Sequence, residues 1–110
     1  MKLSDIKGER TFDVIADLIE PIANIAEDKA AMGLFDRKKP DGMTPEEFAI
    51  SKAKKGAPAL IRDHKNDLIS IFSTIKGVSE EEYVEGLSLG SLLKDLYELM
   101  TDEDLLGFLS

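Results

Sequence analysis

Two places in the chain hold residues that could bind a metal ion. His64 is the only histidine and could serve as a ligand or a general base, but the chain has no cysteine and the sequence pattern indicates no partner converging on it. Asp36 and Glu47 stand where the first and twelfth ligands of a calcium loop would be. Lys38 and Pro40, however, occupy positions that require oxygen ligands. We therefore expect His64 to be a packed or edge residue, and we expect neither a metal nor a cofactor.

Nucleophilic and phosphate-binding chemistry has little support. The glycine-containing segments KGERTF and GLSLGSLL lack the spacing and the lysine of a phosphate loop. Ser91 stands in Gly-Ser-Leu, which resembles the attachment site of acyl carrier proteins, but those proteins usually present Asp-Ser-Leu. Ser91 also has no histidine and acid at a spacing that suggests a triad. The prediction is a protein without catalytic residues, and therefore not an enzyme.

Composition predicts one soluble domain over residues 1–110. The chain is 43% hydrophobic and 33% charged, which is typical of a globular domain of this length. No apolar run approaches the length of a membrane span, and the N-terminal MKLSDIKGER lacks the apolar core of a signal peptide. Without tryptophan and with few other aromatics, surfaces on which bases could stack are scarce. We expect a cytoplasmic protein with no membrane partner.

Charge is distributed unevenly along the chain. The net charge of −8 resides entirely in residues 79–110, whereas residues 37–65 hold eight Lys and Arg against four Asp and Glu. Overall acidity argues against nucleic acid as a partner. The segregation is consistent with ordinary solvated helix faces, with an internal match, or with head-to-tail association. We predict a homo-oligomer in which the basic middle meets the acidic end.

Every apolar stretch repeats at helical spacing, which predicts an all-α single-domain bundle of about five or six helices. In residues 11–33 the acids fall on one narrow strip, and Pro21 predicts a kink or break near residues 17–21. Residues 34–43 are rich in turn formers and predict a mobile loop. Capping residues and glycines then delimit the remaining helices, at residues 44–56, 57–77, 79–86, 88–100 and 101–109. Among them, Thr44 with Glu47 and Ser79 with Glu82 predict capping boxes, and Gly77 predicts a helix end.

The apolar positions of the first and the last helices allow two interpretations. Each residue could belong to the core, or it could anchor a partner on an exposed face kept soluble by the neighbouring acids. The candidate partner-binding residues are Phe12, Ile15, Leu92, Leu96, Leu99, Leu105 and Phe108.

The order of four segments resembles a known protein family. These segments are HKNDLISI, KGVSEEEY, LSLGSLLKDL and TDEDLLGFL. Over residues 44–110 their order resembles that of the tail assembly chaperones of long-tailed bacteriophages, especially those of prophages in Gram-positive bacteria. The likeness lies in helix lengths, turns and an acidic, leucine-rich end, and it includes no catalytic signature.

The resemblance implies a helical, acidic protein that acts in the host cytoplasm and is not retained in the mature virion. Such chaperones are thought to coat the tape measure protein and to recruit tail tube protein to it. Many of their genes end in a programmed frameshift, so the resemblance also implies that Ser110 ends a short form. The alternative is a small acidic phage-encoded regulatory or inhibitor protein that acts by protein–protein binding. A DNA mimic is disfavoured because leucines interrupt the acids.

Overall fold

The structure is a computed structural model that describes residues 3–35 and 39–109. Within these ranges all regular structure is helical, with seven α-helices and two short 3₁₀ helices, so the predicted all-α class is confirmed. The helices in chain order are η1 (Leu3–Asp5), α1 (Arg10–Ala26), α2 (Lys29–Met32), η2 (Gly33–Phe35), α3 (Pro45–Asp63), α4 (Lys65–Lys76), α5 (Glu80–Glu85), α6 (Leu89–Met100) and α7 (Glu103–Leu109).

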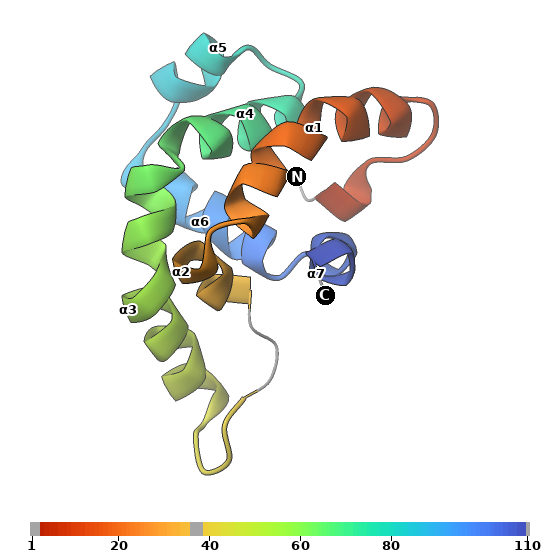
Figure 1. Cartoon of the computed structure of the whole chain (residues 1–110). Helices are drawn as coiled ribbons and strands as arrows, with labels where there is room; N and C mark the ends of the chain where they lie inside the picture. The colour runs from red at the N-terminus through yellow and green to blue at the C-terminus, as the bar shows by residue number, and fades with distance from the viewer. Residues whose placement is uncertain (1–2, 36–38, 110) are drawn as a thin grey trace.

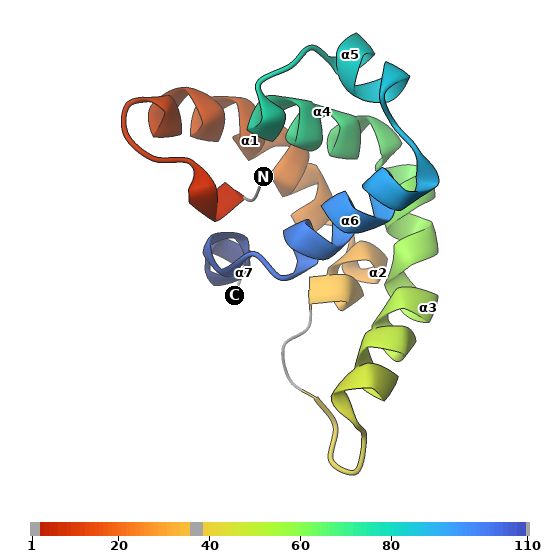
Figure 2. The same cartoon turned by 180° about the vertical axis from the view of Figure 1, so that it is seen from behind.

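The long helices form a layered arrangement with two distinct edges. Helix α1 packs along α4, and α3 packs against α2, η2 and the start of α4. Helix α6 crosses this group on the other face, where Figure 2 shows it in front. The short helices η1 and α7 pack together, and Figure 1 places them at the edge opposite α3. Both ends of the described chain therefore lie on one side of the molecule.

Two predicted helix boundaries are wrong, and the structure gives the reasons. Of the kink or break predicted near Pro21, the break does not occur, because Pro21 lies inside α1; the helix predicted over residues 11–33 is interrupted instead at Asp28, whose carboxylate accepts hydrogen bonds from the first backbone N–H groups of α2. Helix α3 continues through Gly56, where we predicted an end, and stops at His64. A glycine inside a helix costs only about 1 kcal/mol relative to alanine, which tertiary packing regularly offsets.

Other local predictions are confirmed. Thr44 and Glu47 form a capping box at the start of α3, and the hydroxyl of Ser79 caps α5. Gly77 ends α4 with a φ of 71°, a left-handed conformation that a side chain rarely adopts.

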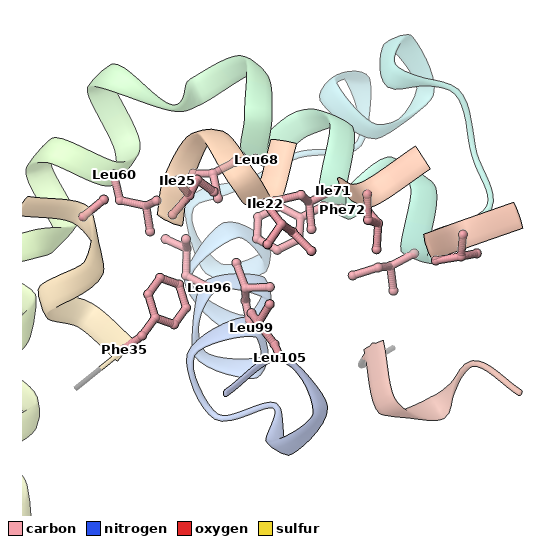
Figure 3. Packing of buried hydrophobic residues seen from close by; sticks show 14 of the residues in the cluster. Ile22, Ile25, Phe35, Leu60, Leu68, Ile71, Phe72, Leu96, Leu99 and Leu105 are labelled. Carbon is pink, nitrogen blue, oxygen red and sulfur yellow. The ribbon is translucent and has the colours of Figure 1, made fainter. Parts of the chain in front are cut away.

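The core is built where α1, α4 and α6 meet. In Figure 3 the side chains of Leu96 and Leu99 on α6 point toward Ile22 and Ile25 on α1. Phe35 at the end of η2 joins this cluster and is buried, although it falls within the predicted loop of residues 34–43. Residues 36–38 of that loop lie outside the described residues.

A 17-residue segment from Lys39 to Lys55 contributes no buried residue. It comprises a turn followed by the first half of α3, and we call it the α3 arm. Figures 1 and 2 show the arm extending away from the other helices, which makes the molecule longest at 43 Å against 28 and 23 Å in the other directions. The arm nevertheless carries apolar side chains, including Ile50, which is 56% exposed.

Candidate binding groove

An open apolar groove of about 240 Å³ lies between η1, α1 and α7. Its walls come from both ends of the chain, which the packing of η1 on α7 brings together. Two of the lining residues, Thr11 and Asp104, have polar side chains. The lining consists of Leu3, Ile6, Thr11, Val14, Ile15, Leu18, Ile19, Ile22, Asp104, Leu105 and Phe108.

Helix α1 forms the long wall of the groove because the neighbouring helices cover only part of its apolar face. Val14 and Leu18 face the core and are buried. At about 100° per residue, Ile15 and Ile19 follow directly on that arc; they remain 51% and 57% exposed. Phe12 lies just beyond them and is 80% exposed. The acids of α1 occupy the other side of the helix, so they leave this apolar strip uninterrupted.

Helix α7 forms the opposite wall and is fixed at its start. Asp102 is buried, and its carboxylate accepts hydrogen bonds from the backbone N–H groups of Asp104 and Leu105 at 3.0 and 3.2 Å. This cap positions Leu105 at the bottom of the groove, where it is buried. One turn later Phe108 lines the same groove but stays 69% exposed. An aromatic ring exposed on the wall of a groove is suited to anchor a partner.

The elements that form the groove are acidic, although the acids of α1 lie on the side of that helix away from it. The elements that form its walls carry six acids, at positions 5, 13, 17, 20, 103 and 104, against the single base Arg10. The guanidinium of Arg10 donates to the backbone carbonyls of Thr74 and Ile75 at the end of α4, at 3.3 and 2.8 Å. The charge of Arg10 therefore offsets the negative end of the α4 dipole.

The structure divides the seven predicted anchors into two groups. Leu96, Leu99 and Leu105 are buried, and Leu92 is half-buried against the core, so these side chains pack inside the monomer. The other three predicted anchors are exposed: Phe12, Ile15 and Phe108.

Residues from both predicted surfaces meet in one place. Ile15 from the first helix and Phe108 from the last line the same groove, with Leu105 beneath them. The sequence reasoning missed Leu3 and Ile6, which belong to an N-terminal segment without a long periodic pattern. It also missed Ile19 as an exposed residue, although the helical spacing of α1 included it.

His64 lies at the junction of α3 and α4, away from the groove lining. Its Nε2 is 2.8 Å from a carboxylate oxygen of Asp28, and its Nδ1 is 2.9 Å from one of Asp67. Asn24 of α1 donates to the second oxygen of Asp67 at 3.0 Å. The cluster of these four side chains therefore connects α1, α2, α3 and α4, and both nitrogens of His64 already have partners.

These contacts shift the pKa values of His64 and Asp28. Burial alone lowers the pKa of His64, but the hydrogen bonds to Asp67 and Asp28, together with their negative charges, outweigh it and raise the pKa above its ordinary value. The hydrogen bond from His64, followed by the backbone N–H of Ala31, lowers the pKa of Asp28. The cluster holds helices together, which agrees with the prediction of a packed histidine.

A second polar cluster lies under α5. The hydroxyl of Tyr83 donates to Asp95 at 2.8 Å, and the Lys76 ammonium is 3.2 Å from the same carboxylate oxygen. Burial, followed by the hydrogen bond and charge of Asp95, raises the pKa of Tyr83. Among the described residues no group of three or more His, Cys, Asp and Glu side chains is arranged to hold a metal ion. Both clusters connect helices.

Among residues 3–35 and 39–109, none of the helices combines the length and the apolar character of a membrane span. No protein-family model matches the chain, and comparisons with curated proteins and with solved structures give no match. The groove, the exposed side chains and the charge distribution therefore provide the basis for a functional proposal.

Proposed function

We propose that this protein is a non-catalytic binding protein whose groove holds an amphipathic helix of a client. We further propose that it is a phage tail assembly chaperone, which binds the tape measure protein and recruits tail tube subunits to it. In this role it acts in the host cytoplasm and does not remain in the mature virion. The observation that supports the proposal most directly is the open apolar groove flanked by exposed Phe12, Ile15 and Phe108.

The dimensions of the groove suit a helix. Along α1 the lining extends from Thr11 to Ile22, which corresponds to about 16 Å, or about three helical turns. A client helix with apolar residues at spacings of three and four places a side chain in such a groove once per turn. Ile15 and Phe108 then contact it from opposite walls.

The charge around the groove suits a chaperone in two ways. Acids near an exposed apolar surface keep the free protein soluble and discourage indiscriminate aggregation. They also favour a client helix with basic residues beside its apolar stripe. A long helical tape measure protein would present many such stripes, each needing cover until the tail tube surrounds it.

Co-expression with the tape measure protein of the same phage tests the proposal. The wild-type chain should increase the soluble fraction of the tape measure protein and co-purify with it. Phe108→Asp and Ile15→Asp should reduce capture at least about tenfold, because each places a charge in the apolar contact. Leu89→Asp is the matched control, since Leu89 is 76% exposed on α6 and does not line the groove.

Unchanged capture by Phe108→Asp and Ile15→Asp would rule out the groove as the client site. Failure of the folded wild-type protein to bind or solubilise the tape measure protein would overturn the chaperone proposal. That result would favour the alternative of a small phage-encoded regulatory or inhibitor protein.

A further inference from the structure

The α3 arm is an unusual feature in a domain of this size. From Lys39 to Lys55 no residue is buried, yet the arm forms a capped helix with apolar side chains on its surface. Ordering such a segment costs conformational entropy that its own contacts offset poorly. A helix of this kind is stabilised when its exposed apolar face packs against another surface.

The outer face of α3 combines apolar and basic side chains. At about 100° per residue, Ile50, Lys54 and Ile61 lie within about 40° of one another, on the side away from buried Gly56 and Leu60. Ile50 is 56% exposed and Ile61 is 38% exposed. Lys54 is the basic residue of this face, with Glu47 about 20° from it, whereas Lys52 lies on the opposite side of the helix.

The groove has complementary properties. It is apolar along its length and carries Asp104 on its α7 wall, whereas the acids of α1 lie on the side of that helix away from the groove. The lengths also agree. Ile50 and Ile61 are separated by the same number of residues as Thr11 and Ile22, so both surfaces extend for about 16 Å.

We propose that the groove of one copy binds the outer face of α3 from a second copy. Ile50 and Ile61 then pack on Ile15 and Phe108, and Lys54 pairs with Asp104. Because α3 lies at one edge of the molecule and the groove at the other (Figures 1 and 2), two joined copies leave one free α3 face at one end and one free groove at the other. The contact is head-to-tail and builds a chain or a ring rather than a symmetric dimer.

The same contact regulates the groove. A client helix and the α3 helix of a neighbour require the same apolar surface, so client binding disassembles the oligomer, and the oligomer protects the groove while no client is present. This competition rests on the proposed function. The head-to-tail contact itself does not, because it involves only residues of this chain.

Two variants that each remove one half of the contact provide the test. Ile50→Asp should leave the groove intact and inactivate the arm, whereas Phe108→Asp should do the reverse. Both positions are exposed in the monomer, so both proteins should keep the wild-type circular dichroism spectrum. In light scattering at low salt, the wild type should form species that grow with concentration, and each variant alone should be monomeric.

Mixing the two variants is the decisive measurement. One intact arm and one intact groove remain, so the mixture should form a 1:1 heterodimer that does not grow further. Raising the salt from about 0.05 M to about 0.5 M should weaken wild-type assembly, since charge pairs at the rim are screened. Leu89→Asp should assemble like the wild type.

Each failure has a distinct meaning. A wild-type monomer at high concentration and low salt, variants that still assemble alone, or a mixture that stays monomeric would each overturn the head-to-tail contact. Heterodimer formation without capture of the tape measure protein would leave that contact in place and overturn the chaperone proposal instead. Capture retained by Ile50→Asp and lost by Phe108→Asp would support both.

Discussion

Helix α6 and the groove both contain apolar residues at helical spacing, but those of α6 are buried whereas several of those in the groove are exposed. On α6, Leu96 and Leu99 are three positions apart and are almost completely buried against α1. On α1 and α7, Ile15 and Phe108 also belong to amphipathic patterns, yet they are 51% and 69% exposed. The difference teaches that apolar periodicity indicates which face of a helix is covered, but not whether the same chain covers it.

The lengths of the neighbouring helices explain this difference. Helix α4 has 12 residues and covers one side of α1, whereas α7 has only seven and η1 only three. The short helices cannot cover the remaining apolar strip of α1, and the groove is what they leave open. Four predictions test the contrast between covered and uncovered residues, in order of decreasing effect on stability.

Leu96→Asp should have the largest effect. It places an unpaired carboxylate where the side chain is 7% exposed, which should cost about 4 kcal/mol or more and unfold the domain. Circular dichroism at 222 nm should show loss of helix. A folded Leu96→Asp protein that merely loses client capture would mean that α6 presents this face to a partner rather than to the core.

His64→Ala should come next. It removes hydrogen bonds to Asp28 and Asp67 and leaves two carboxylates close together, so we expect a loss of about 2 kcal/mol. Urea unfolding should measure it. Because the cluster does not contribute to the groove lining, client capture below the unfolding midpoint should not change.

Raising the pH should lower the stability by a smaller amount, through the same His64 cluster. The folded state raises the pKa of His64, so the stabilisation is complete below the unfolded pKa of 6.5 and is lost as the pH rises through the folded value. The urea midpoint should therefore fall between about pH 6 and about pH 9. In His64→Ala this dependence should disappear, and a fall of equal size would assign it to another group.

How much could be predicted from the sequence depended on whether the cause was local. The capping box at Thr44, the hydroxyl cap at Ser79 and the glycine that ends α4 are local, and all three were predicted correctly from the sequence. The break at Asp28 was missed because that carboxylate serves α2 while pairing with His64, which is 36 residues away. Gly56 was wrongly predicted to end a helix, because a buried glycine inside a helix cannot be distinguished by sequence from a glycine that ends one.

The groove was only half predictable for the same reason. Phe12, Ile15 and Phe108 were candidate anchors by periodicity, but nothing in the spacing indicated that Ile15 and Phe108 would meet. Their meeting depends on η1 packing against α7, which joins segments about 100 residues apart. Periodicity alone likewise did not decide whether Leu96 and Leu99 belong to the core, because their burial depends on the position of α1.

Phe108→Asp should change stability least, by no more than about 0.5 kcal/mol, since its side chain is largely exposed. Its effect on binding should nevertheless be the largest of all. Parallel urea unfolding and client capture measure the two effects. A loss of stability as large as that of Leu96→Asp would show that Phe108 belongs to the core and would remove the distinction between the two regions.

The packing of η1 on α7 has a practical consequence for anyone who tethers this protein. Both ends of the described chain leave the fold beside the groove, so a peptide fused to either end through a short flexible linker would experience a local concentration on the order of millimolar. A weakly binding client helix that is fused in this way could then bind the groove of the same molecule and be detected by fluorescence transfer. The same helix added as a separate peptide would dissociate during co-purification. For the same reason, a bulky or apolar tag at either end would act as a competitor, and untagged protein is the appropriate reference for every binding measurement.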